Sequence, residues 1–85
     1  MKEEKVGVVS HYFDKISVAA IRLTNGSLSV GDRIHIKGHT SDFEQAIESI
    51  QIEHDSVEKA DKGADIGVKV TQKAREHDEV FKIVE

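Results

Sequence analysis

Residues 33–37 read Arg33-Ile34-His35-Ile36-Lys37, an alternation of isoleucine with charged or polar side chains. Because successive side chains of a strand point to opposite faces, Ile34 and Ile36 are predicted to face a core, and the other three side chains to share the opposite face. The rest of the chain favours the same structure, since ten Val and nine Ile stand against two Leu. Branching at Cβ restricts χ1 in helices and packs well on a pleated surface, so the sequence predicts an all-β protein.

Five further segments are predicted to be strands, with turn residues between most of them. They are Lys5–Phe13, Ile16–Thr24, Phe43–Gln51, Ile66–Val70 and Glu79–Val84. The segment 43–51 also has apolar residues at helical spacing, but the β-branched bias and the need to close a sheet favour a strand with a bulge near Ser49. About six strands predict one domain, residues 1–85, folded as a small closed antiparallel β-barrel.

Length and composition exclude several classes of protein. A chain of 85 residues leaves no room for a separate catalytic domain. The apolar fraction of 38% is typical of a soluble globular protein, and no apolar run approaches the roughly 18 residues of a membrane helix. The charged N-terminus does not resemble an export signal, so we expect a cytoplasmic protein without a membrane partner. The absence of cysteine excludes disulfides, thiolate zinc sites and cysteine nucleophiles.

The charge is distributed unevenly along the chain. Residues 1–41 carry six Lys or Arg against four Asp or Glu, whereas residues 42–85 carry six against twelve. We therefore predict a weakly basic face on an acidic protein, with aromatic side chains beside it for base stacking. Phe13 is either such a stacking surface or a core residue. The residues predicted to contact RNA or another partner are His11, Tyr12, Lys15, Arg22, Arg33, His35, Lys37 and His39.

Three motifs, taken in order, resemble a known family. They are Gly7-Val8-Val9, Leu28-Ser29-Val30-Gly31-Asp32, and Val57 to Gly67 with its spaced Ala-x-x-Gly-x-x-x-Gly. Together they resemble the β-barrel second domain of translation GTPases of the elongation factor Tu type, over nearly the whole chain. A similar barrel occurs at the C-terminus of peptidase family U32, and Ile34–Gly38 with the polar loop after it is compatible with that relative.

The resemblance to translation factors implies a module that contacts transfer RNA or a ribosomal component. No contact to the aminoacyl end is transferred, because only six residues precede the opening glycine. No G-x-x-x-x-G-K-[ST] motif is present, so the chain is not expected to bind GTP. The positions that match the family are predicted to serve turns and packing, and they are Gly7, Gly31, Asp32, Gly63 and Gly67. Gly7 and Gly67 lie within predicted strands, which is typical of a bulge or a close backbone approach.

No pattern of residues predicts catalysis. His35 and His39 are four residues apart, but they fall on a predicted strand end and loop rather than on one helical face, and no H-E-x-x-H motif is present. The serines lack a nucleophile elbow, so we expect no metal, no cofactor and no enzymatic activity. Two functions are kept. The first is a non-catalytic, translation-related module that binds RNA or a ribonucleoprotein. The alternative is a protein-interaction barrel that docks on a separately encoded U32-type peptidase or translation GTPase through an exposed edge or apolar patch.

Overall fold

The computed structural model describes residues 2–84, and every regular element in that range is a β-strand. The ten strands are β1 (Lys2–Phe13), β2 (Val18–Leu23), β3 (Leu28–Ser29), β4 (Arg33–Lys37), β5 (Asp42–Ala46), β6 (Ile50–Ile52), β7 (Asp55–Val57), β8 (Lys59–Ala60), β9 (Asp65–Lys69) and β10 (Glu79–Val84). The prediction of an all-β protein is therefore confirmed for the described residues. No helix in that range could cross a membrane.

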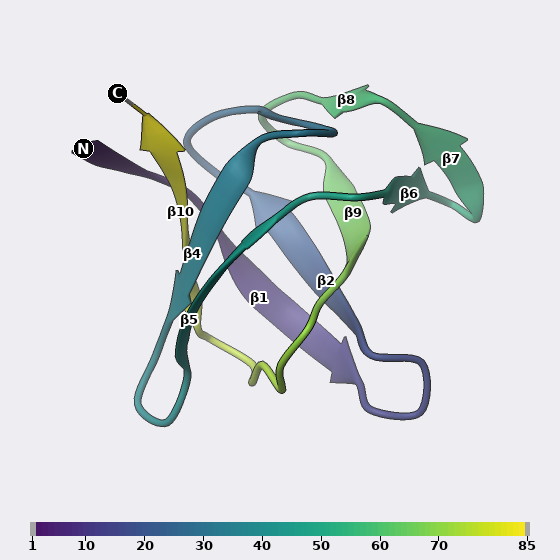
Figure 1. Cartoon of the computed structure of the whole chain (residues 1–85). Helices are drawn as coiled ribbons and strands as arrows, with labels where there is room; N and C mark the ends of the chain where they lie inside the picture. The colour runs from purple at the N-terminus through teal and green to yellow at the C-terminus, as the bar shows by residue number, and fades with distance from the viewer. Residues whose placement is uncertain (1, 85) are drawn as a thin grey trace.

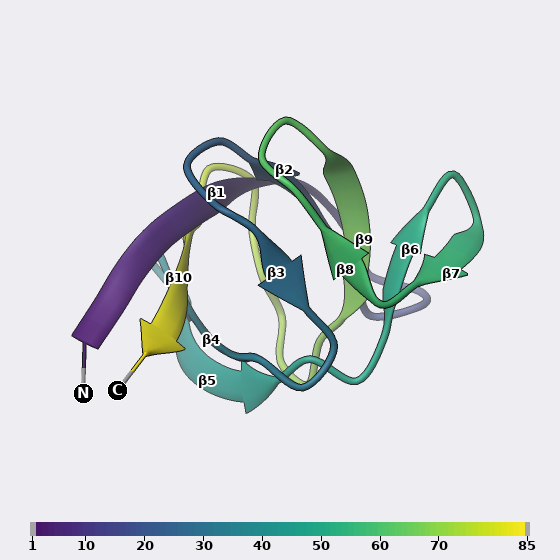
Figure 2. The ribbon, with the colours of Figure 1, turned by 90° about the horizontal axis from the view of Figure 1, so that it is seen from above.

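Eight strands form one antiparallel sheet in the order β5-β4-β10-β1-β2-β9-β6-β7, and β3 pairs with β8 in a second sheet (Figure 1). The large sheet curls strongly, and Figure 2 shows the β3–β8 pair crossing one end of it. Leu28 and Ala60, the apolar residues of that pair, are buried. The small sheet therefore covers the end of the core that the large sheet encloses.

The prediction of a closed barrel of about six strands is wrong in two respects. The large sheet has eight strands, and its outer strands β5 and β7 are not paired with each other. The six strands of five residues or more correspond to the predicted ones, and β6 falls at the end of the predicted segment 43–51, but the short strands β3, β7 and β8 were not foreseen. The segment 43–51 is not one bulged strand, because residues 47–49 separate β5 from β6.

A side chain links β5 to the end of β9 and the residues after it, although β5 and β9 are not paired with each other. The Nε2 of Gln45 donates a hydrogen bond of 2.8 Å to the carbonyl oxygen of Lys69. Its Oε1 accepts from the backbone N–H of Thr71 at 2.7 Å and from the Thr71 hydroxyl at 3.2 Å. Gln45 is 7% exposed. These bonds hold the edge of β5 against residues 69–71 in place of a ladder.

The core is aliphatic, as the composition indicates. Ile34 and Ile36 are fully buried while Arg33 and Lys37 are exposed, so the predicted alternation on β4 is confirmed. Ile21 and Val68 add fully buried side chains from β2 and β9. Burying such side chains supplies the main favourable free energy of folding.

Two glycine positions explain how the chain turns and crosses. Gly31 has a φ of +96°, in the left-handed region that glycine adopts most readily, at the turn before β4. Gly7 lies at a register shift in the pairing of β1 with β10. A Cβ atom at Gly7 would overlap the backbone carbonyl oxygen of Arg22. The strands β1 and β2 can therefore approach closely at this point only because residue 7 has no side chain.

The other residues predicted to serve turns and packing have comparable positions. Gly63 has a φ of +95° in the turn before β9, and Gly67 pairs with Ala20 and Gln51 inside the sheet. The Asp32 carboxylate accepts a 2.9 Å hydrogen bond from the backbone N–H of Ser29, and it closes the turn around Gly31.

Candidate functional site

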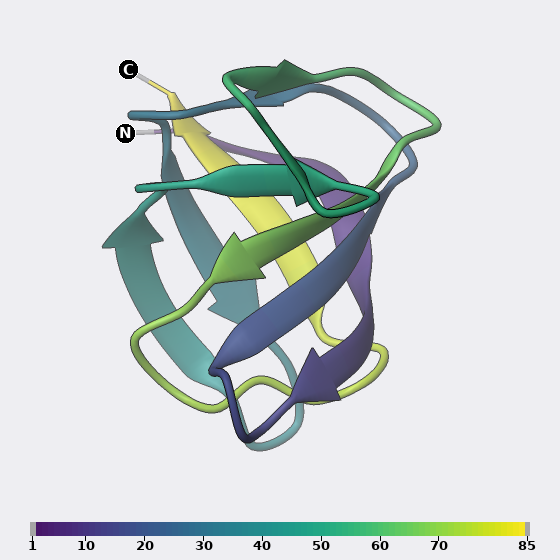
Figure 3. The same cartoon turned by 90° about the vertical axis from the view of Figure 1, so that its right-hand side faces the viewer.

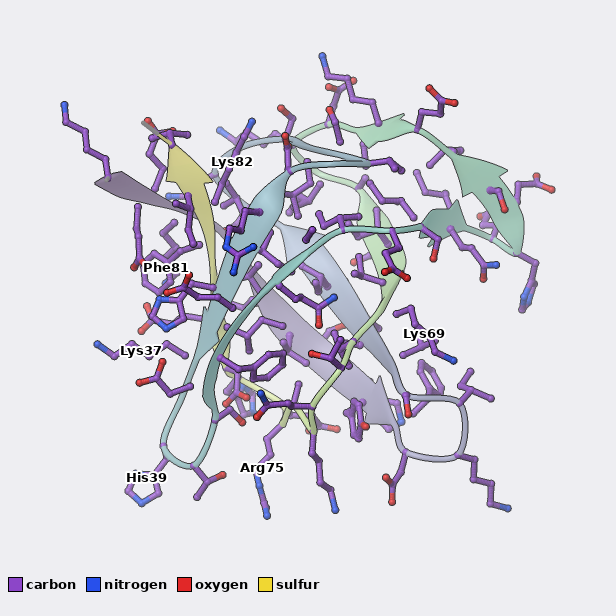
Figure 4. The ribbon with its side chains drawn as sticks, viewed as in Figure 1. Lys37, His39, Lys69, Arg75, Phe81 and Lys82 are labelled. Atoms are coloured by element: carbon purple, nitrogen blue, oxygen red, sulfur yellow. The ribbon has the colours of Figure 1, made fainter. Side chains whose placement is uncertain are left out.

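The eight residues predicted to contact RNA or a partner do not gather on one surface. Four belong to β1, the β1–β2 turn and β2, and four to β4 and the loop after it. Strand β10 lies between β1 and β4. Figure 4 shows Lys37 and His39 near the β4–β5 loop, and Figure 1 shows this loop at the lower left of the molecule and the β1–β2 turn at the lower right. Tyr12 is half-buried and packs against the core.

His35 is the most constrained of these residues. Its Nε2 lies 2.5 Å from Oδ1 of Asp42 on β5, and its Nδ1 lies 2.7 Å from Oε2 of Glu3 on β1. The hydrogen bond with Asp42 raises the pKa of His35, and the hydrogen bond with Glu3 adds to it, while burial opposes the rise. The side chain is only 13% exposed, and its ring lies 6.2 Å from that of Phe81 on β10. His35 therefore links three other strands as an ion-pair centre, with Glu44 also nearby.

The same cluster contains three groups that could coordinate a metal ion. One ligand atom each from Glu3, His35 and Glu44 lies within 4.8 Å of the others. In the structure, however, Nδ1 of His35 is bonded to Glu3, and Glu44 lies 3.5 Å from the guanidinium of Arg33. A cation would have to replace both contacts, so the arrangement fits an ion-pair cluster better than a metal centre.

Acidic partners neutralise most of the predicted basic face. Besides Arg33 and His35, Arg22 pairs with Asp65 at 2.9 Å, and this hydrogen bond raises the pKa of the guanidinium. Nδ1 of His11 lies 3.2 Å from a carboxylate oxygen of Glu76. In the described part of the chain, only three of the predicted contact residues with basic side chains lack an acidic partner, and they are Lys15, Lys37 and His39. The surface is therefore not the continuous positive groove that nucleic-acid backbones require.

A second surface, which the sequence reasoning missed, is apolar. Phe13 and Ile16 flank the tip of the β1–β2 turn, where the N–H of Ile16 donates to the carbonyl of Phe13 at 3.3 Å. Phe13 is 46% exposed and Ile16 is 56% exposed. The interpretation of Phe13 as a core residue is therefore wrong. Large apolar side chains side by side on a surface mark interaction sites more often than single ones do.

These two side chains form one wall of a groove of about 320 Å³. Its floor contains Val18, Ala20 and Gly67 on the outer face of β2 and β9, and its far wall comes from the β6–β7 hairpin. Figure 3 shows this face, with the β6–β7 hairpin above and the β1–β2 turn below. We call this hollow the apolar groove. It is small and open, so it fits a few projecting side chains of a partner better than a substrate enclosed for catalysis.

One signal in the sequence could have indicated the groove. Phe13 and Ile16 border the predicted turn Asp14-Lys15, and a hairpin tip is exposed whatever the rest of the fold. The floor carried no comparable signal, because Ala20 and Gly67 meet only through the pairing of β2 with β9.

The fold and the groove define the class of protein as a small all-β domain with an open apolar groove. Among residues 2–84, no histidine is hydrogen-bonded to a hydroxyl. No family model matches the chain. An uncharacterized protease of Methanocaldococcus jannaschii is 40% identical to it over 82 residues, which is 95% of this chain and 20% of that protein. A collagenase of Porphyromonas gingivalis is 37% identical over 78 residues, which is 91% of this chain and 22% of that protein. The chain thus spans about a fifth of the length of these curated relatives.

Solved structures share the fold of this chain. The C-terminal domain of a putative U32 peptidase of Geobacillus thermoleovorans superposes with a TM-score of 0.87 at 23% identity, and covers 95% of this chain and 93% of that domain. The selenomethionine variant of that domain gives a TM-score of 0.84 at 22% identity, with 91% and 96% covered. The resemblance to the U32 C-terminal domain is confirmed at the level of the fold.

The prediction of a translation-related RNA module is wrong. The sequence relatives are named as a protease and collagenases, and the structural neighbours are C-terminal domains of a putative U32 peptidase. Neither group supports transfer RNA or the ribosome as a partner, and the resemblance to elongation factor Tu finds no counterpart among them. The partner contacts of the eight residues, and the cytoplasmic location, stay predictions.

Proposed function

We propose that this chain is a non-catalytic docking domain that binds the catalytic portion of a U32-type peptidase through the apolar groove. The observation that carries the proposal is the pair Phe13 and Ile16, held exposed at a hairpin tip beside the groove. The comparisons support this partner class, because the chain aligns with about a fifth of each protease-like relative. We therefore take the unmatched four fifths of such a protein as the partner that binds the apolar groove.

The distribution of polar groups supports a non-catalytic role. His11 and His35 face carboxylates rather than a serine or threonine hydroxyl. The hydroxyl of Ser10 donates to the backbone carbonyl of Ala20 at 3.2 Å rather than to a histidine or carboxylate that could act as its general base. We expect the purified chain to release no product from peptide substrates, and turnover that follows the chain through purification would contradict this role.

The effect of removing one apolar side chain can be worked from the structure. Truncation of Ile16 to Ala removes three carbon groups, worth roughly 2.4 kcal/mol when fully buried. Since 56% of Ile16 is exposed in the free domain, docking would newly bury about half of its surface and gain about half of that free energy. The expected loss of affinity is therefore about tenfold, and a similar loss is expected for Phe13→Ala.

The test is a calorimetric titration of the chain with the portion of the M. jannaschii protease that lies outside the matched region. We expect a Kd on the order of 10 μM or tighter, weakened by I16A and by F13A. Val30→Ala is the matched control, because Val30 is 42% exposed and does not line the apolar groove. No binding at about 100 μM of either protein, or equal losses for V30A and I16A, would overturn the proposal.

A further inference from the structure

The hairpin that forms the far wall of the apolar groove contains an unusual turn. Ile52 pairs with Asp55, so Glu53 and His54 form a two-residue connection between β6 and β7. Their φ angles are +50° and +70°. Two consecutive positive φ values are typical of a type I′ hairpin turn, in which Asn-Gly is the preferred sequence. Glutamate and histidine in this conformation carry steric strain that Asn-Gly would relieve.

The strained positions lie around the groove. Glu53 and His54 both line it. A third non-glycine residue with positive φ, Ser17 at +55°, lies between Ile16 and Val18, which line it as well. Three of the four such residues in the described part of the chain thus border one surface, and strain of this kind concentrates at functional sites.

The charges at the groove indicate what the turn would recognise. Asp65 lines the same groove, but its carboxylate is paired with Arg22. Glu53 is exposed and has no ion-pair partner among residues 2–84. An unpaired carboxylate therefore lies at this rim, and a complementary partner presents a cation beside an apolar side chain.

We infer that the Glu53–His54 turn is a recognition element, which places a carboxylate at the rim of the apolar groove for a lysine or arginine of the docked peptidase portion. The inference rests on the proposed function and specifies the partner surface, an apolar side chain flanked by a basic one. The strained turn persists because its side chains face the partner, and stability is lost locally to keep them there.

Two variants separate recognition from folding. Replacement of Glu53 and His54 by Asn and Gly relieves the turn, so we expect the Tm of the free domain to rise by about 5 °C while affinity for the M. jannaschii protease portion falls at least about fivefold. Glu53→Gln keeps the size of the side chain and removes its charge, and we expect a loss of about threefold to fivefold that disappears in about 0.5 M salt. Glu48→Gln, an exposed change outside the groove, is the matched control and should bind like the wild type.

The outcomes distinguish the two proposals. If I16A weakens binding and both turn variants bind like the wild type, the recognition role of the turn is refuted and the docking function stands. If E48Q weakens binding as much as E53Q, the effect is one of net charge, and the inference fails in the same way. If the wild type does not bind, the docking function fails and the inference fails with it.

Discussion

Replacement of Gln45 by leucine tests how the open side of the sheet is held together. Leucine has a similar size, so the change removes the hydrogen bonds and leaves most of the packing. Two backbone groups lose their side-chain partner, the carbonyl of Lys69 and the N–H of Thr71. A buried group left unsatisfied costs about 1–3 kcal/mol, and because residues 69 and 71 are themselves exposed, water limits the cost to the lower end. The expected loss of unfolding free energy for Q45L, summed over the two groups, is about 2–3 kcal/mol.

For a domain of this size, each kcal/mol corresponds to about 4–8 °C in Tm, so Q45L should melt about 10–20 °C below the wild type. The assay is calorimetry together with urea unfolding, and the m-value should change little if the native state stays compact. Gln72→Leu is the control, since Gln72 is exposed and its side chain makes no hydrogen bond among the described residues. A loss below about 0.5 kcal/mol, or one equal to that of Q72L, would refute the idea that this side chain replaces a ladder.

Three further predictions concern other parts of the fold. The pKa of His35 is raised in the folded state, so its ion pairs stabilise the protein fully below about pH 6.5 and are lost as the pH rises through the folded pKa. Urea unfolding from pH 6 to pH 9 should show a decline in the free energy of unfolding of about 1 kcal/mol that is absent in H35Q. Parallel pH profiles of the wild type and H35Q would contradict this prediction. Gly7→Ala should lower the free energy of unfolding by about 1–3 kcal/mol, because the new Cβ would overlap the Arg22 carbonyl. Gly31→Ala should cost less, because a Cβ there meets no atom within 4 Å and only the positive φ opposes it. Equal costs in thermal melts would show that strands β1 and β2 separate easily. Addition of transfer RNA should cause no localised NMR shifts in the wild type, so Lys37→Glu should give the same result. Saturable shifts in the wild type that persist at moderate salt would restore the RNA interpretation.

The parts of the fold that were predictable are those governed by neighbours in sequence. The alternation of residues 33–37 fixes which side chains are buried, because the side-chain period of a strand is two. The end of β5 was not predictable in this way. Whether the segment 43–51 continues as one strand depends on its partners, and the side chain of Gln45 bonds to the backbone of Lys69, at the end of β9, and of Thr71 rather than extending a ladder. A long-range pairing of this kind leaves no periodic trace in a single sequence.

The error in the basic face has a related cause. Positive residues were counted along the chain, whereas the field at a surface depends on what the neighbouring strand presents. Strand β5 pairs antiparallel with β4, which places Glu44 opposite His35 and Asp42 opposite Lys37. Aligning the two segments as a hairpin would have shown an acidic strand beside the basic one. The charge asymmetry between the two halves of the chain thus reports strand pairing rather than a binding face.

The apolar groove and the closure of the sheet can be perturbed separately. Gln45 is buried, and its bonds hold backbone segments together, so its loss is expected to lower stability wherever it is measured. Phe13, Ile16 and Glu53 are exposed and contribute little to the core. Relief of the strained turn should even raise stability while it weakens docking. A set of variants in which stability and affinity move in opposite directions would be difficult to explain by general disruption of the fold, and it would locate the function of this domain on the face between the two hairpins.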